Sequence, residues 1–438
     1  APLDLYRSLL ESNGPTDFIG RRSDSADEAL VQALIVDGIS VDSCASGDVD
    51  IVLNQTPFYA EAGGQVGDVG RIASPSGLAG LVVDTTYGIP GLIVHHGELT
   101  SGKVSVGDTL TATIDSSRRD RIRRNHTATH ILHWALREVL GSDVHQAGSL
   151  VAPERLRFDF NYHEALSVDQ LNRIEEMANL EVIGDARVRH YETTKEEAET
   201  LGALAFFGDK YGDIVRVLEA GDKSIELCGG THVHALGFIG PIKIVSEGSI
   251  GANLRRIEAV TGVDALSFIS SEERVLQDIA SSLKVAPSDL GDRVARLVDE
   301  VKELRREVSK SQASIALIEA NELAALAQDQ FLVLRRDGLA NNDLRRLAVA
   351  TLAAMESGIV GLIGLTPDGT KGAIAVAISP DLIAKGVSAY ELANESAQIL
   401  GGGTGRQADV AVGGGPQVDG IDAAVTSLLK AVTTAKGK

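Results

Sequence analysis

The chain has 438 residues, of which 44% are hydrophobic, and its formal net charge is −20. This length exceeds one typical domain, and the hydrophobic content excludes a globally disordered chain. The acidic balance argues against nucleic-acid binding over the whole surface, because neutralising phosphates needs Lys and Arg. A local basic patch is still compatible with it.

Cysteine content and hydropathy narrow the class of protein further. Only two cysteines occur, Cys44 and Cys228, so we expect no disulfide framework and a reducing compartment. Residues 1–10 lack the apolar core of a signal peptide. The most apolar later stretch, 347–365, contains Glu356, Ser357 and three glycines, which argues against a membrane span. We expect a soluble, cytoplasmic protein without a membrane partner.

Residues 1–115 are expected to form a small β-barrel. Short apolar runs alternate there with Gly, Asp and Ser turns at short spacing. The runs are 29–36, 49–53, 81–85, 92–96 and 109–114. Within this region, the segment from Thr56 to Asp68 contains Gly63, Gly64 and Gly67 around Gln65. Glycines at this density let the backbone approach another group closely, although an ordinary hairpin loop is the alternative.

Residues 116–263 are expected to form an α+β domain. A helical pattern over 118–140 ends at Gly141, and Ser167 with Gln170 forms a capping box that opens a second helix. A hairpin over 148–160 lies between the two helices. Further strands are predicted at 186–191, 214–218, 242–246 and 255–260.

Two short motifs in this domain carry metal-binding side chains. His126 and His130 lie one helical turn apart on one face of the first helix. Cys228 and His232 have the same four-residue separation in a loop. Because imidazole and thiolate are the usual ligands of zinc, these two half-sites predict one zinc centre. Four protein ligands would make the zinc structural, and three with a water would make it catalytic, so both alternatives stay open.

A dense group of arginines comes immediately before His126. Arginine pairs elsewhere are compatible with a solvated helix face, whereas this group adjoins the predicted metal site. We therefore predict a functional basic patch, made of Arg118, Arg119, Arg121, Arg123 and Arg124.

Residues 264–327 are expected to be helical, with Pro287 separating two helices. Apolar residues repeat there at the four-and-three spacing of a coiled-coil seam. They are Leu290, Val294, Leu297, Val301, Leu304, Val308, Ile315 and Ile318, with Ser311 continuing the spacing. The seam is explained equally well by a helical coiled-coil hairpin packed on itself and by a dimer interface.

Residues 328–438 are expected to form an α/β domain. Strands are predicted at 331–334, 358–364 and 373–378, and helices at 342–356, 388–400 and 419–434. The glycine-rich segment 401–415 is predicted to frame a strand over 408–412, and its Arg406 is a candidate contact for an RNA backbone. Altogether we predict an α+β multidomain protein.

Taken together, these motifs resemble the editing half of a bacterial alanyl-tRNA synthetase, and the glycine-rich segment resembles that family's C-terminal domain, which is related to the DHHA1 module. The resemblance covers essentially the whole chain. It rests on His126 to His130, Cys228 to His232, Thr56 to Asp68, Gln146 to Ser149, Arg157 to Phe160 and Gly208 to Asp213.

The resemblance implies an esterase that clears mischarged tRNA(Ala), chiefly its seryl and glycyl esters. It implies that His126, His130, Cys228 and His232 bind zinc, and that the arginine patch and Arg406 contact the tRNA. It further implies that Gln146 lines the substrate pocket and that Thr56 senses the serine hydroxyl. The backbone at Gly63, Gly64 and Gln65 is implied to form part of the same pocket.

The resemblance does not extend to the family's aminoacylation domain, so we expect this chain to hydrolyse mischarged tRNA and not to charge it. It is then a C-terminal part of a synthetase or a free-standing editing protein. Its coiled coil and C-terminal domain are expected to bind tRNA, with a homodimer as one arrangement. The main alternative is a non-catalytic tRNA-binding or dimerisation module with a structural zinc. A DHH-type phosphoesterase is excluded, because no Asp-His-His occurs.

Overall fold

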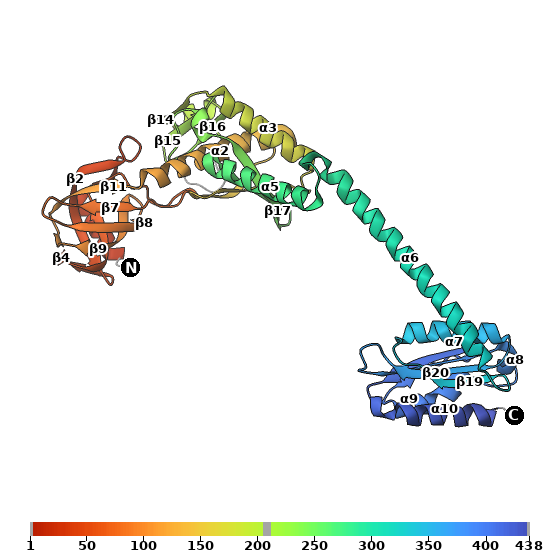
Figure 1. Cartoon of the computed structure of the whole chain (residues 1–438). Coiled ribbons are helices and arrows are strands. Elements are labelled where there is room, and N and C mark those ends of the chain that lie inside the picture. Colours follow the sequence, from red (N-terminus) through yellow and green to blue (C-terminus); the bar gives the residue numbers. More distant parts are fainter. Residues whose placement is uncertain (1–2, 205–211, 436–438) are drawn as a thin grey trace. The chain divides into compact units, whose positions relative to one another are not determined.

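The structure is a computed structural model that describes residues 3–204 and 212–435 (Figure 1). It divides into two compact units, Ala1–Asp278 and Ile279–Lys438, each considered by itself below. Residues 208–211 of the motif Gly208 to Asp213 lie outside the described residues. The predicted boundaries after residues 115 and 263 fall at the beginnings of two helices, α2 (Ser116–Leu140) and α5 (Gly262–Leu283).

A closed six-stranded antiparallel barrel opens the first unit, as predicted. Its strands follow the order β11-β7-β8-β9-β5-β2, and β11 closes the ring by pairing with β2. In β11, Leu110, Ala112 and Ile114 are buried and alternate with three threonines, which is the period-two pattern of a barrel wall. The strands are β2 (Ser25–Val36), β5 (Gly47–Leu53), β7 (Gly70–Ala73), β8 (Ala79–Ile89), β9 (Leu92–Ser101) and β11 (Thr109–Ile114).

Neither strand β7 nor helix α1 (Leu3–Asn13) was predicted from the sequence, and the short strands of this region were missed as well. Tyr6 of α1 is buried in an apolar cluster with residues of β2, β5 and β9, and Leu5 and Leu9 pack against this cluster. The helix therefore covers apolar side chains on the outside of the barrel. Short strands complete the region: β1 (Asp17–Phe18), β3 (Ile39–Val41), β4 (Ser43–Cys44), β6 (Gln55–Thr56) and β10 (Val104–Ser105).

The rest of the first unit combines two antiparallel sheets with helices, which confirms the α+β class. One sheet has the order β12-β13-β18-β17 and the other β14-β15-β16. Their strands are β12 (Gln146–Val151), β13 (Leu156–Asn161), β14 (Val188–Thr194), β15 (Ile214–Ala220), β16 (Ser224–Leu227), β17 (Ile242–Gly251) and β18 (Leu254–Thr261). The helices besides α2 are α3 (Val168–Gly184), α4 (Lys195–Thr200) and the 3-10 turn η1 (Leu236–Ile239).

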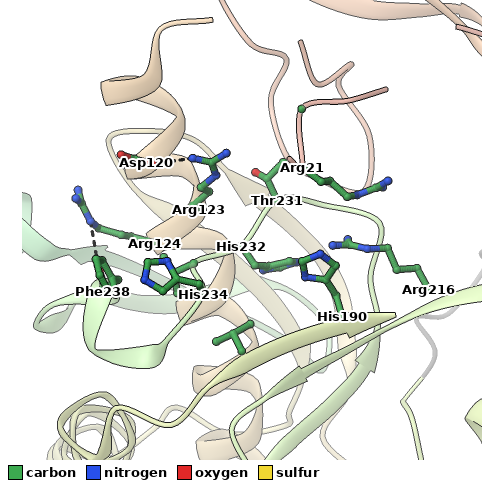
Figure 2. Close-up of a pocket in the computed structure, with 13 residues that line it drawn as sticks. Arg21, Asp120, Arg123, Arg124, His190, Arg216, Thr231, His232, His234 and Phe238 are labelled. Carbon is green, nitrogen blue, oxygen red and sulfur yellow. Dashed lines mark hydrogen bonds and ion pairs between the residues drawn. The ribbon is translucent and has the colours of Figure 1, made fainter. Parts of the chain in front are cut away.

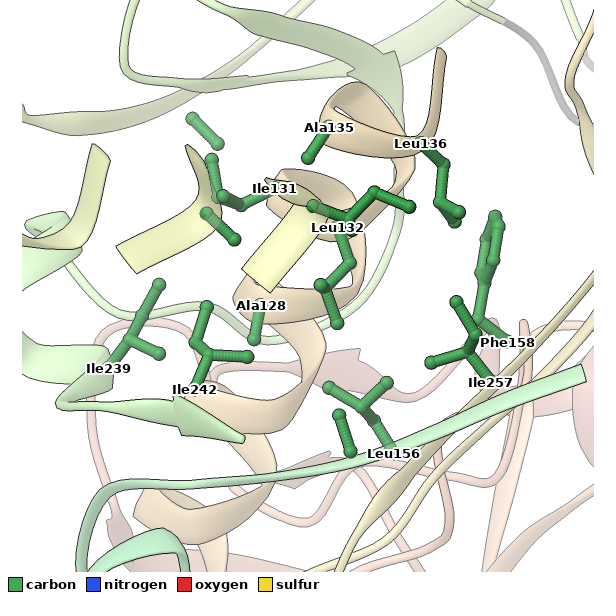
Figure 3. Packing of buried hydrophobic residues seen from close by; sticks show 14 of the residues in the cluster. Ala128, Ile131, Leu132, Ala135, Leu136, Leu156, Phe158, Ile239, Ile242 and Ile257 are labelled. Atoms are coloured by element: carbon green, nitrogen blue, oxygen red, sulfur yellow. The ribbon is translucent and has the colours of Figure 1, made fainter. Parts of the chain in front are cut away.

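Helix α2 occupies the centre of this core. Its apolar face packs against side chains of β13, β18 and the η1–β17 region (Figure 3). Asp115 caps its first turn and Gly141 ends it with φ of 118°. The predicted capping box of Ser167 and Gln170 is present at the start of α3. Packing on both sides of α2 fixes the direction of its buried side chains.

The second unit contains a five-stranded sheet of order β19-β20-β21-β23-β22, in which only β19 and β20 are parallel. The end of α6 (Leu290–Ala325) and α7 (Asn341–Met355) pack on one face. Helices α9 (Ala389–Ile399) and α10 (Ile421–Ala435) pack on the other. The strands are β19 (Phe331–Arg335), β20 (Ile359–Leu365), β21 (Gly372–Ile378), β22 (Gly403–Thr404) and β23 (Val410–Gly415). Short helical segments are α8 (Pro380–Ile383), η2 (Pro287–Asp289) and η3 (Val418–Gly420).

The predicted helix break at Pro287 is present, since α5 ends at Leu283 and α6 begins at Leu290. The seam on α6 lies open in the single chain: Val294 is 47% exposed, Leu304 58% and Ile318 62%. A hairpin packed on itself would bury these side chains, so that part of the fold prediction is not confirmed. No described helix is both long and apolar enough to cross a membrane.

Candidate metal centre

The fold brings the two predicted half-sites together. His126 and His130 project from α2, and Cys228 and His232 come from the loop that follows β16. One nitrogen or sulfur atom of each residue lies within 4.8 Å of those of the other three. Cys228 Sγ is 3.4 Å from His126 Nε2 and 3.2 Å from His232 Nε2. Two segments about a hundred residues apart therefore form one cluster.

The chemistry of this donor set fits zinc. Zinc bonds of roughly 2.0 Å to nitrogen and 2.3 Å to sulfur place neighbouring donors of a tetrahedron about 3.5 Å apart. The two sulfur–nitrogen distances are close to this separation. In His126 and His232 the Nε2 atom faces Cys228, while Nδ1 lies 2.7 Å from Gln65 Oε1 and 3.3 Å from Thr127 Oγ1, respectively. Such partners orient metal-binding rings.

Glu226 is a buried carboxylate that the sequence analysis missed. It lies on β16, two residues before Cys228, and is 2% exposed. Its two oxygens lie 2.6 Å from Nδ1 of His130 and 3.0 Å from Nδ1 of His133. Although burial raises the pKa of Glu226, the two histidines outweigh it and lower the pKa to about 2. The sequence signal for Glu226 was an acidic residue at an inward position of a strand that leads into a candidate metal ligand.

The cluster also favours the thiolate form of Cys228. Burial raises the pKa of this thiol, but its interactions with the neighbouring imidazoles, that of His126 above all, hold the pKa well below its usual value. Burial lowers the pKa of His130, and Glu226 with Cys228 reverses this and raises it to about 10. Burial lowers the pKa of His232 to about 3. A thiolate beside imidazole is the form that binds metal.

The glycine motif of the barrel meets this cluster through Gln65. Gln65 Oε1 accepts from the Thr231 backbone N–H at 2.9 Å and lies beside His126 Nδ1, while Gln65 Nε2 is 2.9 Å from Thr231 Oγ1. Gly63 and Gly64 have φ of 58° and 82°. A Cβ atom on Gly64 would lie 2.4 Å from Ser149 Oγ. The expected close approach is therefore made to β12 of the same chain.

The hydrogen bonds found for Gln146 and Thr56 among the described residues go to partners outside the four-residue cluster. Gln146 Nε2 donates to Ser149 Oγ at 3.2 Å. Thr56 is completely buried, with Oγ1 2.7 Å from His95 Nε2, and it accepts from the Phe58 backbone N–H. The hydroxyl of Thr56 is thus already engaged within the barrel.

The predicted arginine patch divides into buried and accessible members. Arg119 is 0% exposed; it forms an ion pair with Asp68 and donates to the carbonyls of Gly20 and Pro57. The prediction that Arg119 belongs to an accessible patch is therefore wrong, because Arg119 shares the buried face of α2 with Ile122 and His126. Arg119 therefore links the barrel to α2 and has no surface to offer a tRNA.

The other predicted arginines keep part of their side chain accessible. Arg121 pairs with Asp264, and Arg123 pairs with Asp24 and Asp120. The remaining contacts are to backbone carbonyls, from Arg118 to Gly67 and from Arg124 to Phe238. Arg406 is exposed in the second unit, between β22 and β23.

A cavity of about 390 Å³ lies beside the candidate metal cluster and is lined by His232 (Figure 2). Two of its arginines, Arg21 and Arg216, were not predicted. Each is isolated in the sequence from the 118–124 group, so no local pattern marked it. The remaining lining residues are Gly20, Asp120, Arg123, Arg124, Val188, His190, Thr231, Val233, His234 and Phe238.

Comparisons with known proteins identify the family. Residues 215–258 match the family described as the threonyl and alanyl tRNA synthetase second additional domain, and residues 5–118 match class II (A) tRNA synthetases. The alanine–tRNA ligase of Mesorhizobium japonicum is 40% identical over 449 residues, which cover 98% of this chain and 50% of that protein. The chain belongs to the alanyl-tRNA synthetase family.

A second alanine–tRNA ligase agrees with this assignment. The alanine–tRNA ligase of Thermobifida fusca is 40% identical over 97% of this chain and 48% of its own length. The chain thus spans about half the length of the curated alanyl-tRNA synthetase relatives it matches. A crystal structure of the C-Ala domain from Aquifex aeolicus alanyl-tRNA synthetase is 26% identical and covers 24% of this chain and 90% of its own, with a TM-score of 0.22.

Proposed function

We propose that this chain is an editing hydrolase that releases serine and glycine from mischarged tRNA(Ala), and that it binds one zinc ion to do so. The observation that carries the proposal is the meeting of His126, His130, Cys228 and His232 beside an arginine-lined cavity. Membership of the alanyl-tRNA synthetase family supports the substrate class. Aminoacylation of tRNA belongs to the relatives' full-length proteins and is not proposed for this chain.

Zinc in this cluster would supply a Lewis acid that orients the aminoacyl ester and polarises or positions the attacking water. Other residues of the chain orient the side chains of the proposed zinc ligands. Glu226 holds Nδ1 of His130, and Gln65 holds Nδ1 of His126, so both rings have defined orientations. Thiolate formation at Cys228 is favoured by the surrounding imidazoles.

The cavity offers a means of recognising the ester end of a tRNA. Its arginines supply the positive charge that phosphates require, although the whole chain is strongly acidic. Phosphate contacts position a nucleic acid without reading its bases. Arg123 and Arg124 line the cavity, and Arg118 and Arg121 extend the same helix. We therefore keep these four in the proposed tRNA surface, together with Arg406 in the second unit.

Rejection of alanine requires a polar group that is paired only when serine is bound. A site that hydrogen-bonds a hydroxyl leaves its own polar groups unpaired with a substrate that lacks one. Thr231 lines the cavity. Its hydroxyl accepts from Gln65 Nε2 but keeps a second lone pair, so it is a second candidate beside Thr56. Gln146 and the backbone of Gly63 and Gly64 remain proposed pocket residues.

The experiment that tests this function is release of serine from Ser-tRNA(Ala), with Ala-tRNA(Ala) as the control ester. We expect rapid loss of serine and glycine only, and loss of this activity in a folded His130→Ala variant. If wild-type chain binds tRNA and retains zinc while both esters survive, the alternative of a non-catalytic binding module with a structural zinc replaces the proposal. That alternative is favoured by the same four-ligand cluster.

The second unit is proposed to bind tRNA and to associate through the exposed seam of α6. Several of its apolar side chains are more than half exposed in one chain, among them Leu304, Val308 and Ile315, and burial in a paired helix would remove them from water. Sedimentation of the wild-type chain and a Leu304→Glu variant tests this, because only a seam-mediated dimer dissociates on substitution.

A further inference from the structure

Two arginines from separate segments hold the loop that carries the metal ligands Cys228 and His232. Arg216 Nη1, on β15, donates to the carbonyls of Cys228 at 3.0 Å and Gly230 at 2.7 Å. Arg21 Nη2, from the barrel, donates to the Gly229 carbonyl between them at 2.8 Å. Three consecutive carbonyls of the loop therefore accept hydrogen bonds from two guanidinium groups.

The carbonyls of the loop do not neutralise these two guanidinium charges, although the Cys228 thiolate and Glu192 attract Arg216. Backbone carbonyls accept hydrogen bonds but carry no net charge, and no ion pair of Arg21 or Arg216 with a carboxylate is found within the described residues. Arg123, in contrast, pairs with two aspartates at the other side of the same cavity. Arg21 and Arg216 also lie close enough to repel each other electrostatically.

Both side chains face the cavity that contains His232, and both lie beside His190 (Figure 2). Arg21 is also held in place from the barrel side, because its guanidinium lies 5.2 Å from the centre of the Phe18 ring. A guanidinium has five N–H donors in a planar fork. Hydrogen bonds to one or two carbonyls leave further donors on each group for an anion.

We propose that Arg21 and Arg216 together bind a backbone phosphate of the single-stranded 3′ end of the tRNA while they hold the Cys228–His232 loop. This inference rests on the proposed function and names the part of the substrate that the two arginines recognise. The same guanidinium groups thus connect the position of the ester-bearing end with the position of two metal ligands. An anion between the two groups also relieves their mutual repulsion.

The binding test compares the full-length chain carrying Arg21→Gln or Arg216→Gln with an Arg22→Gln control. Arg22 is the adjacent arginine, is exposed, and does not line the cavity. Two probes are used: uncharged tRNA(Ala), and the same tRNA shortened by its single-stranded 3′-terminal nucleotides. Dissociation constants are measured across a salt series, and zinc content and thermal unfolding are measured for every variant.

We expect Arg21→Gln and Arg216→Gln each to weaken binding of intact tRNA roughly ten-fold and to reduce the salt slope by about 0.7 to 1. Binding of the shortened tRNA should change less than two-fold, as should binding of both probes to Arg22→Gln. Arg216→Gln should also lose zinc to a chelator faster than wild type. If Arg216→Gln does not fold, Arg216→Lys takes its place in the comparison, because lysine keeps the positive charge but lacks the planar fork that holds the loop carbonyls.

The inference is overturned if Arg21→Gln and Arg22→Gln bind intact tRNA equally well, or if the loss is equal for intact and shortened tRNA. Serine release by the wild-type chain is measured in parallel, because its absence refutes the proposed function instead. An active wild type whose Arg21 and Arg216 variants bind like wild type refutes this inference alone.

Discussion

Replacing Gly230 by Ala should disable the proposed metal centre through the volume of one methyl group. A Cβ at this position would lie 2.1 Å from Cε1 and 2.5 Å from Nδ1 of His126, and 2.9 Å from Gln65 Oε1. Ordinary contact begins at about 3.4 Å, so the His126 ring must retreat by about 1.3 Å (3.4 − 2.1) or the loop must move by as much. Metal–ligand distances tolerate only about 0.2 Å. We expect zinc affinity to fall at least 100-fold, which exceeds the usual effect of losing a ligand's orienting partner.

The neighbouring glycine provides a matched control. A Cβ on Gly229 would meet nothing within 4 Å, so Gly229→Ala should bind zinc within two-fold of wild type. Zinc affinity is measured by competition with a chelator of known affinity, and serine release is measured on the same preparations. If Gly230→Ala and Gly229→Ala bind zinc equally, His126 is not held against this loop and the geometric reasoning is wrong.

Three further perturbations probe the ligand support, the barrel junction and a surface pair. Glu226→Gln should weaken zinc binding by about 10- to 100-fold, because its carboxylate orients a ligand ring; unchanged chelator competition would contradict this. Arg119→Met should cost about 3–5 kcal/mol in urea unfolding by leaving a buried carboxylate unpaired, whereas Arg22→Met should cost almost nothing. The pKa of His96 is raised chiefly by its hydrogen bond to Asp50. Stability from this pair is therefore fully present below the unfolded pKa of about 6.5 and is lost as pH rises through the folded pKa. The stability difference between wild type and Asp50→Asn should shrink with rising pH, and a constant difference between pH 5.5 and 9 would refute it.

Local signals predicted most of the secondary structure because the interactions that encode it are themselves local. The capping box at Ser167 and Gln170 involves residues three positions apart, and Gly141 ends α2 through its own backbone angle. The alternation in β11 likewise reflects its immediate neighbours. Strand β7 was missed because only four residues take part in it, too few for a periodic pattern.

The direction of each side chain on the helix explains why Arg119 was wrongly placed in the accessible arginine patch. Composition alone does not distinguish buried from accessible arginines among the five that lie within residues 118–124. On a helix they point in different directions, so Arg119 enters the junction with the barrel while Arg123 and Arg124 reach the cavity. Helical phase with Ile122 and His126 contained this information, and reading it would have separated Arg119 from the rest.

The sequence by itself determined the family, the four candidate ligands and the elements on which they lie, because ligand type and spacing are properties of short segments. Tertiary structure alone decided that the half-sites meet, with His126 and Cys228 102 residues apart in sequence. It also decided that Glu226 supports His130, and that Arg21 and Arg216 hold the ligand loop. These contacts join separate elements whose relative positions are set by packing of buried side chains, and no local pattern encodes them.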